Sequence, residues 1–179
     1  MRYELFRGYV PTKNKRATVK FKDSPALPYD KVANLEEYAG VLNDDTVLID
    51  IDDKAQSDIL MDIVEELQID CRVYQTTRGR HFLFRNNGRI TKCATDSTLA
   101  IGLHSDIKVG VNSIEVLKFN GENRFIEWDI VDDTHEYGIV PKWLLPVKTN
   151  TDFLSIFEIK TNSYCFSSCF FCFFALRIY

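Results

Sequence analysis

The stretch VLIDIDD, residues 47–53, combines a run of aliphatic side chains with carboxylates at its end. A run of this kind predicts a buried central strand. Because strand side chains alternate between faces, Asp50 and Asp52 should project from the same face, roughly 7 Å apart. Two such carboxylates repel each other, and a divalent cation would neutralise them. Asp52 and Asp53 are equally suited to cap a following helix, so both interpretations stay open.

Length and composition indicate a folded protein with one principal domain. The chain has 179 residues, of which 45% are hydrophobic and 27% charged, as in globular proteins. The net charge of −4 gives no general attraction to nucleic acid, so any such contact needs a local basic patch. The N-terminus has no apolar signal segment, and the cysteine count of five is odd. Both observations predict a reducing compartment with free thiols.

The residues around the acidic stretch predict a mixture of helix and strand. Residues 30–39 carry apolar side chains at helical spacing and predict a short helix. A longer amphipathic helix should follow the carboxylates, with Ser57 or Asp53 as its N-cap. Its predicted core-facing stripe consists of Ile59, Leu60, Ile63, Val64 and Leu67. Residues 71–76 read as a strand, so the order of elements indicates a βαβ-type unit with the acidic pair at one edge of its sheet.

The next stretch, TTRGRH at residues 76–81, concentrates groups that bind anions. Gly79 permits a tight hairpin, and the returning strand should begin at His81. Arginine, threonine and histidine side chains crowd this one turn. Their concentration favours a phosphate site over the alternative, an exposed hairpin tip.

Asp106 and Lys108 lie on one face of a further alternating segment, residues 106–110, which places a third carboxylate beside a basic group. The remaining elements follow from turn residues and apolar alternation. They are a polar loop at 89–97, a short strand at 99–102, strands at 113–119 and 124–128, and a hairpin turn at Asn120-Gly121.

The two ends of the chain differ in composition from the middle. The first 22 residues are the most basic segment, with Lys13, Lys15, Arg16 and Lys20, and suit either nucleic-acid phosphates or a solvated face. Residues 158–179 are dense in Cys and Phe without a polar face. We expect residues 1–157 to form the folded domain and the tail to be a truncated or out-of-frame addition.

Three of these segments, in this order, resemble the motifs of archaeo-eukaryotic-type primases. The closest resemblance is to the primase-polymerase domain of phage and plasmid primase-helicases. Residues 47–52 match its hhhDhD strand, and residues 76–81 match its T-x-S/R-G-x-H-like turn. Residues 106–110 match its hydrophobic-flanked Asp followed by a basic residue, and the resemblance covers roughly residues 1–155.

The resemblance implies an α+β fold and template-directed nucleotidyl transfer. An RRM-like βαβ unit would contribute Asp50 and Asp52, and a β-rich module would contribute His81 and Asp106, with the active site between them. The chain would then act as a DNA primase or polymerase in phage or plasmid replication, in the cytoplasm of a bacterial host. Relatives continue into a helicase domain with a G-x4-G-K-[ST] loop, which this sequence lacks.

The resemblance also assigns roles to particular residues. The three aspartates Asp50, Asp52 and Asp106 would be catalytic and would ligate two Mg²⁺ or Mn²⁺ ions. The triphosphate of an incoming NTP or dNTP would contact His81, with Thr77, Arg78, Arg80 and Lys108 as further nucleotide-binding candidates. The single-stranded DNA template would be bound by Lys13, Lys15, Arg16 and Lys20, and no membrane contact is expected.

The main alternative is a non-catalytic module that binds single-stranded nucleic acid or a partner helicase through its basic segment and exposed aromatics. Metal-dependent nucleotide binding would distinguish the two, since the binding module should show none. A haloacid-dehalogenase-like phosphatase fits less well, because Lys54 stands where Thr or Val is usual. A PD-(D/E)xK nuclease is also disfavoured, because Glu115 and Lys118 are one residue too far apart.

Overall fold

The computed structural model describes residues 4–22, 24–129 and 136–147. The chain divides into one compact unit from Met1 to Pro146 and a second from Val147 to Tyr179. All described residues except Val147 belong to the first unit. The predicted domain boundary at residue 157 and the predicted tail, 158–179, lie outside the described residues.

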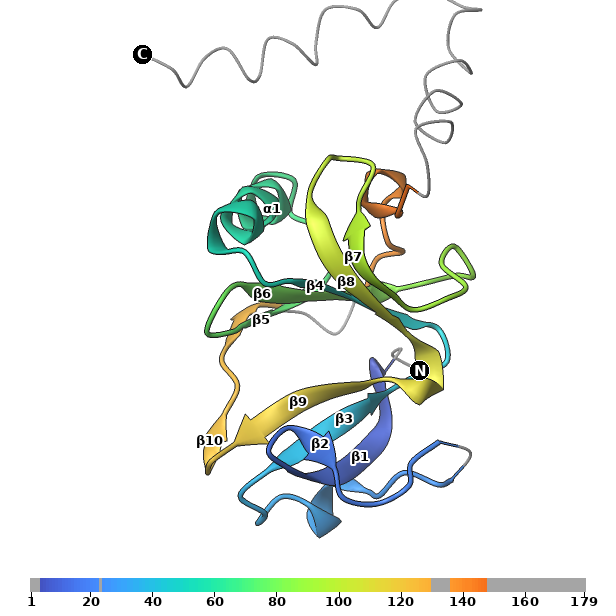
Figure 1. Cartoon of the computed structure of the whole chain (residues 1–179), viewed down its shortest axis with the longest axis vertical. Coiled ribbons are helices and arrows are strands. Elements are labelled where there is room, and N and C mark those ends of the chain that lie inside the picture. Colours follow the sequence, from blue (N-terminus) through green and yellow to red (C-terminus); the bar gives the residue numbers. More distant parts are fainter. Residues whose placement is uncertain (1–3, 23, 130–135, 148–179) are drawn as a thin grey trace, which may run out of the picture. The chain divides into compact units, whose positions relative to one another are not determined.

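Within the described residues, one α-helix accompanies two antiparallel sheets, which confirms the predicted α+β class with a β-rich body (Figure 1). The five-stranded sheet has the order β10-β9-β3-β1-β2, and the six-stranded sheet has the order β11-β5-β6-β4-β8-β7. The strands of the first are β1 (Phe6–Lys13), β2 (Arg16–Ala17), β3 (Tyr38–Leu42), β9 (Ile114–Phe119) and β10 (Glu122–Asn123). Those of the second are β4 (Thr46–Ile51), β5 (Arg72–Gln75), β6 (Arg80–Arg85), β7 (Ala94–Thr98), β8 (His104–Val109) and β11 (Ile126–Trp128).

Residues 47–51 of the acidic stretch lie in β4, an interior strand of the six-stranded sheet in which every residue is buried, whereas Asp52 and Asp53 follow the strand and are exposed. The predicted βαβ unit is present in a split form. The helix α1 (Lys54–Glu66) connects β4 to β5, but β6 lies between these two strands and is antiparallel to both. β4 and β5 therefore run parallel without touching, as in a split βαβ unit.

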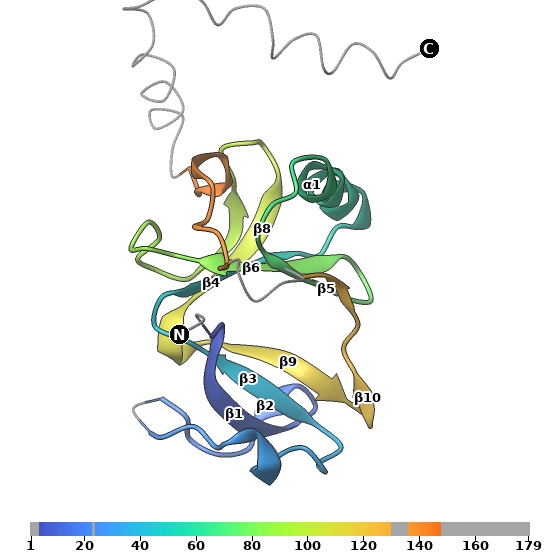
Figure 2. The same cartoon turned by 180° about the vertical axis from the view of Figure 1, so that it is seen from behind.

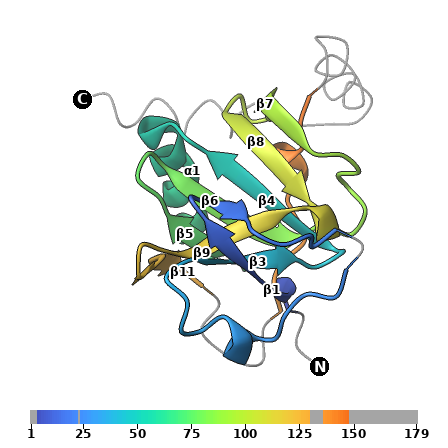
Figure 3. The same ribbon diagram turned by 60° about the horizontal axis from the view of Figure 1, so that its bottom comes forward.

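The two faces of this sheet pack against different partners. Val47, Ile49 and Ile51 of β4 join α1 in the larger apolar core. Leu48 faces the other way and clusters with Leu42 of β3, which belongs to the five-stranded sheet. Figure 2 shows α1 on the outer side of β4 and β6, and Figure 3 shows β1, β3 and β9 lying across their other side. The alternation of β4 thus separates a helix face from an inter-sheet face.

The helix α1 starts at one of the two predicted N-caps, but its apolar stripe differs from the prediction. The N-cap is Asp53, whose carboxylate accepts the Gln56 N–H at 2.8 Å, whereas Ser57 is buried in the first turn. Leu60 and Val64 are buried as predicted. The other two buried residues of the helix are Ser57 and Met61. The predicted stripe is wrong at its edges, because Ile59 is 43% and Leu67 is 63% exposed. The α1 face that packs is therefore narrower than the sequence indicates.

Three further predictions are wrong, two of them because distant strands complete the sheets. Residues 30–39 do not form a helix: only a 3-10 turn, η1 (Tyr29–Lys31), forms there, and β3 begins at Tyr38. Residues 38–42 are fully buried between β1 and β9, which makes them a central strand. β7 replaces part of the predicted loop at 89–97, and the predicted strand at 99–102 is mostly turn. The extended edge of β8 provides the pairing that makes residues 94–98 a strand.

The remaining predicted strands are confirmed as β5, β9 and β11, and the hairpin turn at Asn120-Gly121 is confirmed by its geometry. Both turn residues have positive φ, 51° and 80°, which suits a tight two-residue hairpin. Two more 3-10 turns complete the described chain, η2 (Gly110–Asn112) and η3 (Lys142–Leu144). No helix in the described part of the chain is long and apolar enough to cross a membrane.

Candidate metal and phosphate site

Three predicted site residues form one row across the six-stranded sheet. In the strand register, Asp50 of β4 lies opposite His81 of β6 on one side and opposite Asp106 of β8 on the other. Residues directly opposite each other on neighbouring strands project from the same face. The row therefore lies on the inter-sheet face. His81 and Asp106 come from the same sheet as Asp50, so the prediction that a separate β-rich module supplies them is wrong.

Asp50 is buried, and two basic side chains surround its carboxylate. His81 Nε2 lies 2.9 Å from Oδ1, and Lys108 Nζ donates to Oδ2 at 2.7 Å. Burial alone would raise the pKa of Asp50, but the close contact and charge of His81 and the charge of Lys108 outweigh it. The pKa of Asp50 is therefore held well below its usual range, and the carboxylate is ionised at neutral pH.

Asp50, Asp52 and His81 offer ligand atoms that all lie within 4.8 Å of one another. Asp50 Oδ1 is buried and accepts no hydrogen bond from the described residues, because the approach of His81 Nε2 is an ion-pair contact without hydrogen-bond alignment. A buried carboxylate oxygen without a donor, beside a second carboxylate, matches what a hard divalent cation requires. The donor set therefore fits Mg²⁺ or Mn²⁺, the ions expected from the sequence.

Asp106 is half-buried and stands next to this cluster without belonging to it. Its Oδ1 accepts the backbone N–H of Asp96 at 2.9 Å, which orients the carboxylate. The Cβ atoms of directly opposite strand residues are about 5 Å apart, so Asp106 and Asp50 are near enough to serve one pair of cations. The register brings the predicted third aspartate to the site, while its part in metal binding stays a prediction.

The turn before β6 lies directly against the end of β4. A Cβ added to Gly79 would stand 1.9 Å from the carbonyl oxygen of Ile51, so only glycine permits this approach. Thr76 Oγ1 accepts the Gly79 N–H at 3.0 Å and closes the turn. The close approach places Arg78 beside Asp52, and the two form an ion pair. Thr77, the remaining candidate of this turn, is exposed.

Arg80 belongs to the opposite face and is not brought to Asp50. Its guanidinium donates to Glu127 of β11 at 2.6 Å and to Asp58 of α1 at 2.5 Å. Arg80 and His81 are consecutive residues of β6, and consecutive strand residues project from opposite faces. Arg80 thus connects the helix to the sheet edge on the far side from the acidic row.

The basic residues near the N-terminus occupy the five-stranded sheet. Lys13, Lys15, Arg16 and Lys20 are all exposed, on the β1–β2 hairpin and just after it. Lys15 has φ 64° in the turn, and its Nζ lies 5.0 Å from the ring centre of Phe119. Their exposure suits contact with nucleic-acid phosphates, which stays a prediction.

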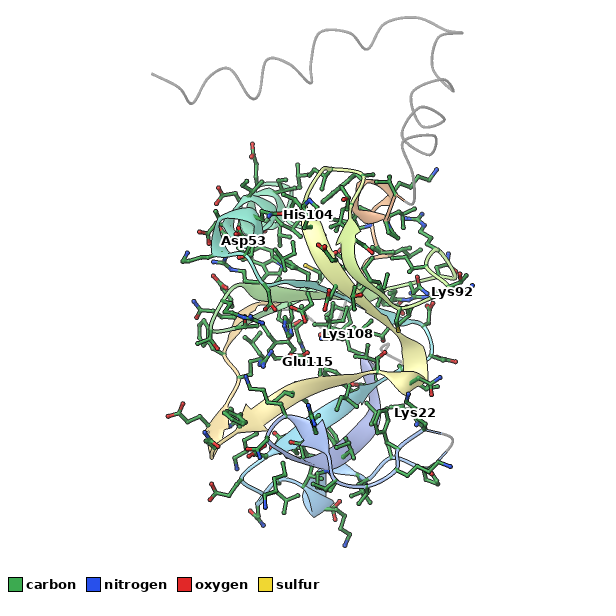
Figure 4. All side chains as sticks on the ribbon, in the orientation of Figure 1. Lys22, Asp53, Lys92, His104, Lys108 and Glu115 are labelled. Atoms are coloured by element: carbon green, nitrogen blue, oxygen red, sulfur yellow. The ribbon has the colours of Figure 1, made fainter. Side chains whose placement is uncertain are left out.

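Two site residues had no assigned function in the sequence analysis, Glu115 of β9 and Arg124, which follows β10. Glu115 is 1% exposed; its Oε2 lies 2.8 Å from His81 Nδ1, and its Oε1 accepts Arg124 Nη1 at 2.8 Å. Figure 4 shows Glu115 and Lys108 between the two sheets. The sequence feature that could have identified Glu115 is the alternation of the strand at 113–119, which places this carboxylate on the same face as the apolar Leu117.

His81 is therefore enclosed by two carboxylates. Burial would lower the pKa of the imidazole, but the negative charge of Glu115 and the contacts with Asp50 outweigh burial and raise it. Nδ1 faces Glu115 and Nε2 faces Asp50, at 2.8 and 2.9 Å. Both ring nitrogens therefore face carboxylates, and the raised pKa favours the protonated form of the ring.

Comparisons with protein-family models, with curated proteins and with solved structures found no match. The resemblance to primases therefore stays a hypothesis that rests on the three sequence motifs.

Proposed function

We propose that this chain is a metal-dependent nucleotidyltransferase that extends a nucleic-acid strand on a single-stranded DNA template. The observation that carries the proposal is the row of Asp50, His81 and Asp106, with basic side chains directly beside its carboxylates. Carboxylates suit hard divalent cations, and cationic side chains suit phosphate oxygens. A nucleoside triphosphate complexed with Mg²⁺ or Mn²⁺ presents both partners at once.

In the proposed reaction, Asp50 and Asp52 would hold one cation, and Asp106 would contribute to a second. Such ions, when bound, activate a 3′-hydroxyl and stabilise the pyrophosphate that leaves. Protonated His81 would donate a hydrogen bond from its Nε2–H to a phosphate oxygen, and Lys108 would add positive charge. The chain's own residues thus contribute by positioning and by charge stabilisation.

The exposed basic hairpin at Lys13–Arg16 is the proposed contact for the template strand, because phosphate binding depends on local Lys and Arg. With the sequence resemblance, the activity proposed is that of a DNA primase or polymerase in phage or plasmid replication. It would take place in a bacterial host cell and would need a helicase supplied by another chain or domain.

The test is template-directed incorporation by the full chain on single-stranded DNA, with and without a primer, in Mg²⁺ and in Mn²⁺. We expect incorporation, and we expect Asp52→Ala to abolish it while the circular dichroism spectrum and the melting temperature stay close to those of the unaltered chain. Asp53→Ser is the matched control, because it removes the adjacent carboxylate but keeps an N-cap for α1.

Full incorporation activity of Asp52→Ala would contradict the assignment of the metal site. A folded chain that binds DNA but incorporates nothing in either metal would favour the non-catalytic binding module.

A further inference from the structure

Among the Asp, Glu, His, Lys and Arg residues that the structure describes, the buried ones are Asp50, His81 and Glu115. These three are connected in one line, since His81 contacts Asp50 through Nε2 and Glu115 through Nδ1. The line crosses between the sheets: Asp50 and His81 belong to the six-stranded sheet, and Glu115 belongs to β9 of the five-stranded sheet. A buried carboxylate is costly unless it is fully paired, so the place of Glu115 calls for a physical reason.

Each oxygen of Glu115 contacts a different basic side chain. Oε2 lies 2.8 Å from His81 Nδ1, and Oε1 accepts a hydrogen bond from Arg124 Nη1, also at 2.8 Å. The same Arg124 nitrogen is 3.0 Å from His81 Nδ1, so the three groups form one compact cluster. Arg124 is itself anchored, because its backbone N–H donates to the Leu117 carbonyl at 2.8 Å as the chain leaves β10 for β11.

We propose that Glu115 and Arg124 are positioning residues for His81, an inference that rests on the proposed nucleotidyl transfer. An imidazole anchored through Nδ1 can present only Nε2 to the site, and the hydrogen bond on one ring nitrogen fixes the orientation of the other. Arg124 neutralises the second oxygen of Glu115, which keeps the carboxylate in place. The five-stranded sheet thereby takes part in the chemistry of the six-stranded sheet through a single histidine.

A bland alternative is that Glu115 only tethers the two sheets. A tether would lower stability when removed, but its effect on catalysis would not depend on His81. A positioning residue acts through His81, so its effect should vanish once His81 is gone. A double-mutant cycle separates these two cases.

The experiment compares Glu115→Gln, His81→Ala and the double variant in the full chain, by kcat and KM for nucleotide incorporation. We expect Glu115→Gln alone to lower kcat/KM by roughly 10- to 100-fold, as when the partner of an orienting histidine is lost. In the His81→Ala background the same substitution should change kcat/KM less than about twofold. Glu127→Gln is the matched control, because it breaks a carboxylate–arginine pair with Arg80 on the helix face. Its effect should be the same with and without His81.

A second readout needs no activity. The sequence contains three histidines, so the NMR spectrum of a chain with ¹⁵N-labelled histidine is simple. The ring nitrogen signals that disappear in His81→Ala belong to His81. Glu115→Gln should shift the Nδ1 signal of His81, and Glu127→Gln should leave it in place. An unshifted signal, or equal effects of Glu115→Gln in both backgrounds, would overturn the inference while leaving nucleotidyl transfer intact. Absence of incorporation by the unaltered chain would instead overturn the proposed function, and the inference with it.

Discussion

The two faces of the six-stranded sheet use the same strands for opposite purposes. On the helix face, Ile49, Ile51 and Phe82 have no exposed surface and contribute to the apolar core. On the inter-sheet face, the ionisable Asp50 and His81 stand one residue away from these side chains. A step of one residue along a strand therefore separates the apolar core from the ionisable side chains of the proposed site. Asp50 is flanked by the core residues Ile49 and Ile51, and His81 and Asp106 each have one core neighbour, Phe82 and Ile107.

The two arginines of the hairpin show the same division. Arg78 lies beside Asp52 with its side chain 73% exposed, whereas Arg80 is 11% exposed and paired with Glu127. Both arginines have the same chemistry and flank the same glycine. Only their faces differ, so one can meet a ligand and the other holds α1 and β11 to the sheet.

The strongest test of this division is Asp50→Asn on the inter-sheet face. We expect incorporation to fall by roughly 10³-fold or more, because the isosteric amide removes the ionised ligand at the centre of the row. Ile49→Val is the control from the adjacent position on the helix face. It should cost about 1 kcal/mol in the free energy of unfolding and leave kcat within about twofold. Both variants would be measured by denaturant unfolding and by primer extension. A large loss of incorporation in Ile49→Val would contradict the division between the two faces.

The arginines give a test of intermediate size. Arg80→Gln should lower the free energy of unfolding by about 2 kcal/mol, chiefly because Glu127 is left half-buried without its cation. Arg78→Gln should change the unfolding free energy by less than about 0.5 kcal/mol, since exposed ion pairs contribute little. It should nevertheless raise the KM for nucleotide severalfold. If the two variants exchanged these effects, the assignment of the arginines to separate faces would be wrong.

The sequence predicted the parts of the site that depend on local pattern. The aliphatic run of β4, the side-chain alternation that places Asp50 on one face, and the glycine turn before His81 are all properties of neighbouring residues. The structure confirms β4, the turn at Asn120-Gly121 and the pairing of strands on both sides of Asp50.

What the sequence missed depends on partners that are distant in the chain. Glu115 meets His81 across 34 residues and from another sheet, which no local pattern encodes. Residues 38–42 become a strand because β1 and β9 flank them, and this overrides the helical spacing that precedes them. The two arginines were indistinguishable because the phase of a strand after a turn is uncertain by one residue, which is enough to reverse a face.

The smallest effect we predict is a pH dependence of the free energy of unfolding. On the inter-sheet face the loss of stability should begin at a lower pH than on the helix face. The contacts of His81 raise its pKa in the folded protein, so its contribution to stability is complete below the unfolded value of about 6.5 and is lost as pH rises through the folded value. On the helix face, burial raises the pKa of the Cys71 thiol, so the folded state resists its ionisation. Cys71 therefore lowers the free energy of unfolding only above the pKa of the thiol in the unfolded chain, about 8.5.

The free energy of unfolding, measured in a chelating buffer, should therefore begin to decline above about pH 6.5, by no more than about 1.4 kcal/mol per pH unit, the slope of one proton. His81→Gln should remove this decline, while His104→Gln, at an exposed position, should keep it. Cys71→Ala should alter only the steeper decline above about pH 8.5. A decline that still begins near pH 6.5 in His81→Gln would place the titrating group elsewhere, and the two carboxylates around His81 would then not be the cause of the pH dependence.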